Sequence, residues 1–231
     1  MGLPVNRRKN VTYKRGRRIR LPDVPGVRRE QPHWDAGRIV AGVDEVGRGA
    51  WAGPVTYAAV ILPSDRRMYK LRDSKLLDPV RRRQLAARVH DFARAVSIGE
   101  ATNAEIDTLG MSAAMQLAAR RAVQGLEVRP EVLLLDGNWD FCADLETTNE
   151  CIVHGDAHSA SIAAASIVAK VTRDSHMAEV VAAEHPPYDF ASNKGYPSPS
   201  HRAALAQHGP CASHRQTWAP LRELLDTTQK D

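Results

Sequence analysis

Short runs of consecutive apolar residues constrain this chain more than any other feature of its sequence. Two runs cover residues 39–43 and 55–62, and a third covers residues 132–135 and ends at Asp136. Runs of this length that are bounded by glycine, proline or a turn are typical of buried strands. We therefore predict three buried strands. No run approaches the roughly 20 apolar residues that a membrane-spanning helix needs.

Helix signals lie between the second and third runs. Asp78 is suited to cap a helix that starts at Pro79, and apolar residues then recur at spacings of three and four. Thr102 is suited to cap a second helix, whose apolar stripe covers residues 111–122 and ends near Gly125. Two helices are therefore predicted in this part of the chain.

Weaker strands and a long helix complete the predicted order of elements. Strand signals lie at residues 96–100 and 151–153, and residues 159–183 predict one long helix whose small residues permit close packing on a sheet. The segment from Pro186 is interrupted by proline and glycine and favours short helices. This order predicts an α/β domain with a mixed central sheet covered by helices.

The bulk composition is that of an ordinary globular protein. With 231 residues, 43% of them hydrophobic, the chain is expected to form one domain with a sizeable core. Its three cysteines are too few for a disulfide framework, and no apolar stretch follows the basic N-terminus. We therefore expect a soluble protein of the reducing cytoplasm.

Positive charge is concentrated at the N-terminus. Residues 1–30 contain ten Lys or Arg and two acidic residues, a net charge of +8, so the rest of the chain contributes −3 to the total of +5. A basic tail on a slightly acidic body is suited to neutralising phosphates. We expect residues 1–37 to be a flexible basic arm and residues 38–227 to be the folded domain.

Acidic residues follow the predicted strands. Asp44 and Glu45 end the first run, Asp136 ends the third, and Asp156 precedes the long helix. A carboxylate in such a place needs a cation to offset its desolvation, and all-oxygen ligands favour Mg²⁺ or Mn²⁺. Because adjacent strand residues point to opposite faces, Asp44 and Glu45 can share a site only if the backbone turns or bulges, which Gly47 permits.

Six motifs together resemble the type 2 ribonuclease H family, specifically ribonuclease HII. They occur in the family's order between residues 38 and 220. The motifs are residues 43–49 (VDEVGRG), 73–75 (DSK), 134–137 (LLDG), 155–156 (GD), 162–174 (IAAASIVAKVTRD) and 194–196 (KGY).

The resemblance implies a ribonuclease H-like fold, with a five-stranded mixed sheet flanked by helices and a helical C-terminal appendage. It implies an endonuclease that cuts RNA in RNA–DNA hybrids and at ribonucleotides within duplex DNA, leaving 5′-phosphate and 3′-hydroxyl ends. A water activated by one or two Mn²⁺ or Mg²⁺ ions would attack the phosphodiester in line. We expect a monomer. The implied catalytic and metal-binding residues are Asp44, Glu45, Asp136 and Asp156.

Substrate contacts are also implied by the resemblance. The glycines around Arg48 would let the backbone reach the 2′-hydroxyl, and Tyr196 would stack on the sugar of the following deoxynucleotide. The remaining contacts would be to phosphates. The implied substrate-binding residues are Gly47, Arg48, Gly49, Ser74, Lys75, Lys194 and Tyr196. Two positions depart from the family's pattern: His154 replaces a common Lys, and Pro197 with Ser198 replaces the usual residues after Tyr196.

The same residues permit other interpretations. A dinucleotide-binding loop at residues 47–53 should open a helix, but Pro54 and a strand-like run follow. A zinc site could join Cys151 and His154 to a second Cys-x-x-His pair at residues 211–214, although a buried Cys and a surface His are expected instead. A DNA-cutting nuclease or recombinase of similar fold, and a non-catalytic nucleic-acid binder, remain as rival functions.

Three further expectations concern the C-terminal half. The histidines at positions 201, 208 and 214 are expected on the surface, because they lie in a polar, proline-rich segment. His214 and the adjacent Arg215 are expected to contact the backbone of the nucleic acid. Asp174 is expected to pair with Lys170 one helical turn earlier and not to bind metal.

Overall fold

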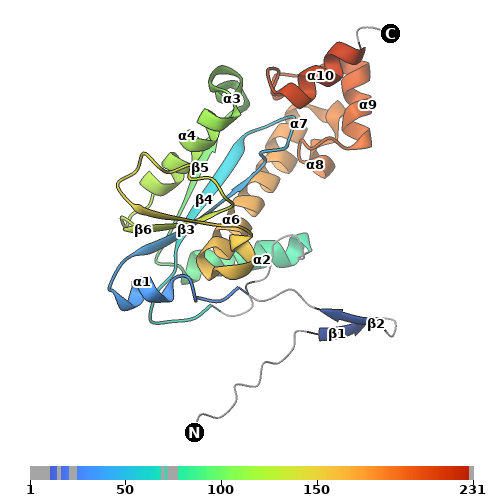
Figure 1. The fold of residues 1–231 in the computed structure, drawn as a ribbon. Coiled ribbons are helices and arrows are strands. Elements are labelled where there is room, and N and C mark those ends of the chain that lie inside the picture. Colours follow the sequence, from blue (N-terminus) through green and yellow to red (C-terminus); the bar gives the residue numbers. More distant parts are fainter. Residues whose placement is uncertain (1–10, 15–16, 21–24, 69–70, 72–77, 229–231) are drawn as a thin grey trace.

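A computed structural model describes the chain over residues 11–14, 17–20, 25–68, 71 and 78–228. Its centre is a five-stranded mixed sheet with the strand order β5-β4-β3-β6-β7 (Figure 1). Strands β3, β6 and β7 are parallel to one another, and β4 and β5 extend the sheet with antiparallel pairing. The strands are β3 (Val40–Val46), β4 (Val55–Ile61), β5 (Ala95–Ala101), β6 (Val132–Asp136) and β7 (Thr148–Ile152).

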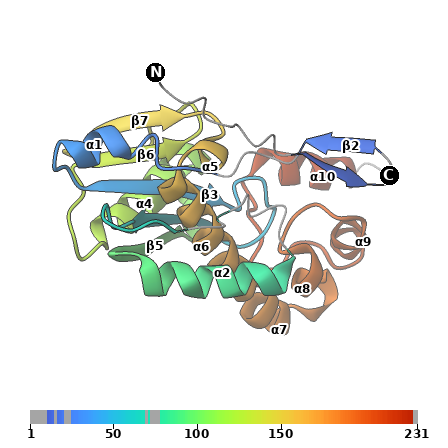
Figure 2. The same ribbon diagram turned by 90° about the horizontal axis from the view of Figure 1, so that it is seen from below.

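Helices cover both faces of this sheet (Figures 1 and 2). On one face α4 (Met111–Gln124) packs on β4 and β5, and on the other face α6 (Ala160–His176) packs on β3 and β4 with α2 (Pro79–Phe92) beside it. The predicted α/β fold with a mixed sheet is confirmed. The side chain of Asp78 caps α2 by accepting a hydrogen bond from the backbone of Arg81, as the sequence predicted.

The helix predicted from Thr102 to Gly125 is instead two helices, so this prediction was wrong. α3 (Asn103–Leu109) ends at Gly110, whose φ of +78° is a conformation that glycine adopts without strain, and α4 begins at the next residue. The predicted cap is correct, because Thr102 and Glu105 bond reciprocally at the start of α3. The spacing of apolar residues continues across the break, which hides it in the sequence.

The other boundaries differ less from the predictions. Strand β7 begins three residues before the predicted strand at 151–153, and Ser159 caps α6, so the predicted long helix is confirmed. A π-helical turn (Met177–Val181) and α7 (Ala182–Glu184) continue it. The remaining helices are α1 (Gln31–Asp35), α5 (Gly155–His158), the 3₁₀ turn Pro186–Tyr188, α8 (Phe190–Asn193), α9 (Pro199–His208) and α10 (Ala219–Thr228).

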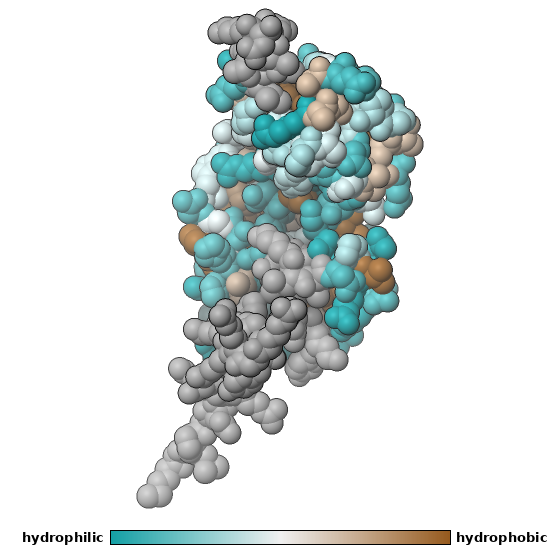
Figure 3. All heavy atoms as spheres, turned by 90° about the vertical axis from the view of Figure 1, so that its right-hand side faces the viewer, coloured by the Kyte–Doolittle hydropathy of each residue, from teal (hydrophilic) through white to brown (hydrophobic). Residues whose placement is uncertain are grey.

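The C-terminal helices form the predicted appendage beyond one end of the sheet, next to the end of α6 (Figure 1). They share an apolar cluster with the π-helical turn that follows α6, and this cluster includes Met177, Tyr188, Phe190 and Leu205. On the face that Figure 3 shows, apolar residues are scattered among hydrophilic ones. Among the described residues, no helix is long and apolar enough to cross a membrane.

The chain packs on the domain from residue 25 onward, earlier than the boundary expected at residue 38. Glu30 is fully buried, and Trp34 packs against apolar residues of the core. Before this segment, β1 (Val11–Lys14) and β2 (Arg17–Arg20) pair with each other in antiparallel fashion. The sequence analysis placed Glu30 in the basic arm, because a count of charges does not show which of them are buried.

Close packing of α6 on the sheet depends on Gly42 in β3. A Cβ atom at this position would lie 2.1 Å from the carbonyl carbon of Ser161, near the start of α6. Only a residue without a side chain lets the two backbones approach this closely. The close approach predicted from the small residues of the helix is confirmed.

We expect Gly42→Ala to destabilise the protein, because the added methyl would meet backbone atoms that cannot move independently. The free energy of unfolding should fall by about 1–3 kcal/mol or more. Gly26→Ala is the matched control, since a Cβ there would meet no atom within 4 Å. Denaturant unfolding of both variants checks the prediction, and equal stability of Gly42→Ala and the wild type would contradict it.

Candidate active site

The strand register brings Asp44 and Asp136 side by side. The parallel pairing of β3 and β6 matches Val43 with Leu135, so the next residues of the two strands are neighbours on the same face of the sheet. This is the face that α6 covers, because Asp44 is hydrogen-bonded to Ser166 of that helix. Asp156 lies in α5, directly before α6, and is buried. Three of the predicted carboxylates therefore gather at one end of the sheet.

Glu45 reaches this end of the sheet from the opposite face. β3 pairs with β4 without interruption through Glu45 and Val46, so the bulge considered in the sequence analysis is not present in this strand. The chain turns only at Gly47, whose φ is +92°. However, β6 ends at Asp136, so β3 extends beyond its neighbour and has an open edge at Glu45. An open edge can be approached from both faces, which removes the need for a bulge.

Asp44 is a buried carboxylate with like charges beside it. It is 5% exposed, and burial is the largest cause that raises its pKa well above the usual value, followed by repulsion from Glu45 and then from Asp136. Two hydrogen bonds oppose this shift: one from Ser166, and one from the backbone N–H of Glu45, which lies 2.7 Å from Oδ1 of Asp44. The ionised form of Asp44 is therefore only partly compensated by the protein.

Asp136 is held by the start of α5. The backbone N–H of Gly155 donates to its Oδ1 at 2.6 Å. A Cβ on Gly155 would lie 2.6 Å from Cδ1 of Ile162 and 3.3 Å from that same carboxylate oxygen. A glycine directly before Asp156 thus lets the helix start approach Asp136.

The donor set fits a hard divalent cation. The four groups offer only oxygen atoms, two of them belong to buried residues, and their mutual repulsion would be relieved by positive charge. Within the described residues, no three or more His, Cys, Asp or Glu side chains are already arranged to hold an ion. The backbone brings the carboxylates to the same end of the sheet.

Two buried arginines hold the loop between β3 and β4. The guanidinium of Arg173, on α6, donates to the carbonyl oxygens of Ala52, Pro54 and Lys194 at 2.8–3.0 Å. A Cβ on Gly47 would lie 2.2 Å from Nε of Arg173, so only glycine fits there. Arg173 thereby joins the loop to the segment that contains Tyr196.

Arg215 is the second of these arginines, and its expected contact with nucleic acid was wrong. It is fully buried, and its guanidinium donates to four backbone carbonyls at 2.7–3.0 Å. Burial, and then repulsion from Arg173, lower its pKa to about 9, which leaves it charged at neutral pH. The accepting carbonyls belong to Arg48, Ala50, Gly53 and Pro54.

Most of the predicted substrate-binding residues lie together around this loop. Gly47 is buried, whereas Arg48 and Gly49 are exposed. The backbone N–H of Trp51 donates to the carbonyl of Gly195 at 2.8 Å, which places the loop against residues 194–196. The half-buried ring of Tyr196 has Lys170 and Arg173 at 5.6 and 5.4 Å from its centre. Ser74 and Lys75 lie outside the described residues.

Two histidines expected on the surface are buried instead. His201 and His214 are fully buried and contact each other through their Nε2 atoms at 2.9 Å. Nδ1 of His214 accepts from the backbone N–H of Cys211, and Nδ1 of His201 contacts the carbonyl of Tyr196. A single chain of donors satisfies both rings when both are neutral. Aromatic neighbours bury the pair, which the local composition did not indicate.

The remaining alternatives gain little support from the structure. Cys151 and His154 are both exposed, so the prediction of a buried cysteine there was wrong, whereas a surface histidine is confirmed. Lys170 donates to Asp174 at 2.9 Å, which confirms the predicted ion pair. The loop after β3 leads into β4 and not into a helix, as the sequence analysis expected.

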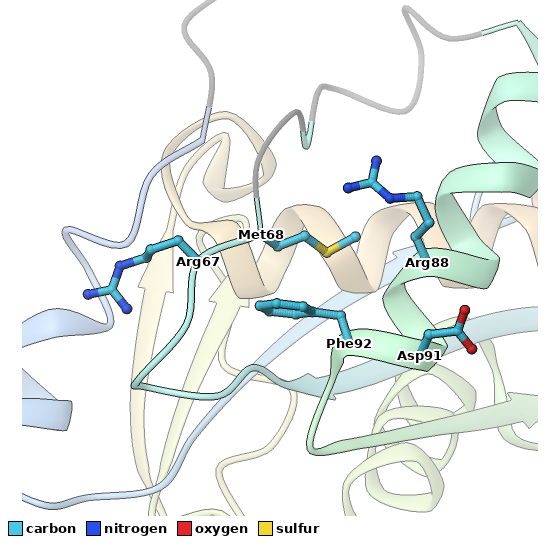
Figure 4. A pocket seen from close by; sticks show the side chains of 5 residues that line it. All are labelled: Arg67, Met68, Arg88, Asp91 and Phe92. Carbon is cyan, nitrogen blue, oxygen red and sulfur yellow. The ribbon is translucent and has the colours of Figure 1, made fainter.

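A pocket of about 340 Å³ lies near the end of α2 (Figure 4). None of the four carboxylates lines it, so we assign the candidate chemistry to the end of the sheet and not to this pocket. The lining residues are Arg67, Met68, Arg88, Asp91 and Phe92.

Several residues of this site were missed by sequence reasoning. Ser166 and Arg173 lie inside the quoted motif at residues 162–174, but their contacts depend on which face of α6 meets the sheet. Tyr57 lies opposite Glu45 in the register, and burial and then Glu45 raise its pKa. No periodic pattern in the sequence indicates these contacts, because they depend on strand register and on the placement of α6.

Comparisons with known proteins agree with this architecture. The family model described as Ribonuclease HII matches residues 41–221. A curated Ribonuclease HII from Streptomyces griseus is 49% identical over 81% of this chain and 80% of its own length. The crystal structure of ribonuclease H2 from Pyrococcus horikoshii superposes with a TM-score of 0.71 at 27% identity, over 84% of this chain and 100% of that one. Bst-RNase HIII in complex with Mn²⁺ shares the fold, with a TM-score of 0.63 at 17% identity, over 84% and 71%.

We expect Arg215→Lys to destabilise the loop between β3 and β4. Lysine keeps the charge but cannot reach four carbonyls with one planar group, and each buried carbonyl that loses its donor costs about 1–3 kcal/mol. Arg202→Lys is the matched control, because Arg202 is exposed and stacks over Trp51. Thermal unfolding should show a large fall in melting temperature for Arg215→Lys and a small one for the control. Similar falls in the two variants would contradict the role of Arg215 in holding the loop.

The buried histidine pair predicts a pH dependence of stability. Burial, and then repulsion from His201, lower the pKa of His214 to about 4 in the folded state. The ordinary pKa of a histidine, which applies in the unfolded chain, is 6.5. The unfolded chain therefore binds more protons in this interval, and the stabilisation present above pH 6.5 is lost as pH falls toward 4. Unfolding free energies measured across this range should have a shallower slope in His214→Asn, and an unchanged slope would count against the assignment.

Proposed function

The chain belongs to the ribonuclease HII family, and from that premise we propose that four carboxylates at the end of its sheet form the hydrolytic site. They are Asp44, Glu45, Asp136 and Asp156. The observation that carries this proposal is the register of β3 and β6, which sets Asp44 beside Asp136 with their repulsion only partly compensated.

Family membership defines the chemistry at the level of the substrate class. The protein is an endonuclease that hydrolyses the RNA strand of RNA–DNA hybrids. Membership argues against both rival functions, the DNA-cutting recombinase and the non-catalytic binder. A binder would also have no use for a carboxylate cluster, which repels phosphate in the absence of a cation.

A divalent cation, Mg²⁺ or Mn²⁺ in one or two copies, is the proposed cofactor. The all-oxygen donor set supports it, as does the Mn²⁺ complex of Bst-RNase HIII, which has a similar fold. When bound, such an ion supplies the charge that activates a water molecule and stabilises the phosphate during in-line attack, leaving 5′-phosphate and 3′-hydroxyl ends.

The protein's own groups orient the carboxylates for this role. Ser166 and the backbone N–H of Glu45 hold Asp44, and the N–H of Gly155 holds Asp136. Hydrogen bonds of this kind restrict the rotation of a metal-binding carboxylate and are worth about 10–100-fold in affinity or activity. Placement on two neighbouring strands makes the site rigid.

Recognition of a ribonucleotide is proposed for the loop after β3 and for Tyr196. Arg48 and Gly49 are exposed on a loop that two buried arginines hold, so their backbone can present fixed groups to a 2′-hydroxyl. Tyr196 lies on the adjoining segment and would stack on the next sugar, while Lys194 contacts a phosphate. A junction from RNA to DNA, including a single ribonucleotide in duplex DNA, is the substrate that this arrangement favours.

The parts of the chain outside this site have simpler proposed roles. Residues 25–227 are the proposed catalytic domain, and the basic segment before them is proposed to attract the polyanionic substrate. Ser74 and Lys75 are proposed phosphate contacts. The protein is proposed to act as a cytoplasmic monomer.

The substrate proposal is tested with a labelled DNA duplex that carries one ribonucleotide. We expect incision on the 5′ side of the ribonucleotide with Mg²⁺ or Mn²⁺ and none with a chelator, because the carboxylates alone cannot activate water. An all-DNA duplex is the control. Equal cutting of that control would contradict ribonucleotide recognition, and cutting in the presence of chelator would contradict the cofactor.

The site is tested with Asp44→Asn, which keeps the shape of the side chain and removes its charge. We expect cleavage to fall by about 10²-fold or more, since the site loses a charged ligand, while duplex binding is retained. Asp174→Asn is the matched control, because Asp174 pairs with Lys170 outside the carboxylate cluster. Rates and duplex affinities of both variants decide the matter, and full activity of Asp44→Asn would exclude this residue from the site.

A further inference from the structure

Glu30 is a buried acidic residue that the proposed mechanism does not use. It lies before α1 and is 0% exposed. Its Oε1 atom accepts three hydrogen bonds, from the hydroxyl of Ser159 at 2.6 Å and from the hydroxyl and backbone N–H of Ser161 at 2.6 and 2.9 Å. Its Oε2 atom is buried without a hydrogen-bond partner in the described residues. Such a group costs free energy unless its charge is balanced.

The start of α6 supplies that balance. Ser159 is the N-cap of this 17-residue helix, and its hydroxyl also accepts from the backbone N–H of Ile162. Unpaired N–H groups give a helix N-terminus a partial positive charge, which favours a nearby carboxylate. Glu30 therefore acts as a second cap, supplied by a distant part of the chain.

The main chain around Glu30 reinforces the connection. Gly26 pairs with Ser159 in a parallel bridge, and its carbonyl accepts from the backbone N–H of Ala160 at 2.9 Å. The segment that contains Gly26 and Glu30 thus fastens the junction between α5 and α6. It lies before the matched family segment, which begins at residue 41.

This junction carries the carboxylate that no strand holds. Asp156 precedes Ser159 by three residues, and the backbone N–H of Ser159 donates to the carbonyl of Gly155 at 2.8 Å. Gly155 in turn donates to Asp136. Hydrogen bonds therefore link Glu30 through Ser159 and Gly155 to Asp136. Asp156 lies between Gly155 and Ser159 in the sequence.

We propose that Glu30 is a positioning residue that fixes Asp156 against the strand carboxylates and so sets the affinity of the site for a divalent cation. The proposal rests on the proposed function, in which Asp156 is a ligand. Glu30 touches neither substrate nor metal. Its loss changes cation binding and leaves duplex binding intact, because it is buried and its hydrogen bonds go to Ser159 and Ser161, neither of which is a proposed substrate contact.

Isothermal calorimetry with Mn²⁺ alone as the probe tests this on the full-length protein. Glu30→Ala removes the acceptor, and we expect the Mn²⁺ dissociation constant to rise about ten-fold, the effect typical of lost support to a metal ligand. Glu30→Gln keeps an oxygen at the Oε1 position and should bind Mn²⁺ more tightly than Glu30→Ala does. Thr102→Ala is the matched control, since it also removes a helix cap, at α3, where the capping partner is Glu105 and none of the four carboxylates.

Asp156→Asn separates failure of the inference from failure of the proposed function. If Asp156→Asn weakens Mn²⁺ binding while Glu30→Ala binds as the wild type does, Glu30 only supports the fold and the inference is overturned. If Asp156→Asn binds Mn²⁺ normally, the ligand assignment itself is wrong and the inference falls with it. Should Glu30→Ala not fold, Ser161→Ala removes one donor to Glu30, and unchanged Mn²⁺ affinity in that variant overturns the inference.

Discussion

The contact between α6 and β3 at Gly42 is the constraint on which the site depends. The backbone of Ser161 lies where any side chain at Gly42 would be, so the helix start rests directly on the central strand, two residues before Asp44. This contact fixes α5 as well, because Asp156 belongs to the turn that leads into α6. The register of β3 and β6 then supplies Asp136. The close backbone approach and the strand register together position residues from three separate segments.

Buried positive and negative charges differ in how far hydrogen bonds compensate them in this molecule. The guanidiniums of Arg173 and Arg215 are surrounded by backbone carbonyls, which compensate them without any external ion. Asp44 is hydrogen-bonded as well, yet burial and two neighbouring carboxylates still raise its pKa. The cationic pair therefore has a structural role, holding the loop that presents Arg48. In the proposed function, the charge of the anionic cluster is balanced by a cation.

Much of the fold and the core of the candidate site could be predicted from the sequence. Apolar runs that end in carboxylates revealed β3 and β6 together with Asp44 and Asp136, because strand burial depends on local composition. The break at Gly110 was missed, since the helical spacing continues across it. The roles of Arg215 and Glu30 could not be predicted, because their burial depends on contacts with residues more than 100 positions away. The open edge of β3 beside Glu45 is likewise a product of register, which spacing along the chain does not reveal.

The central claim is that the repulsion among these carboxylates is relieved by a divalent cation at the end of the sheet. The most direct measurement is a crystal structure with Mn²⁺ and an uncleaved ribonucleotide-containing duplex, in which anomalous scattering locates the metal. The account predicts an anomalous peak beyond the end of β6, bound by oxygens of Asp44 and Asp136 and next to the phosphate of the ribonucleotide. A peak held by other residues, or a duplex bound away from these carboxylates, would contradict it.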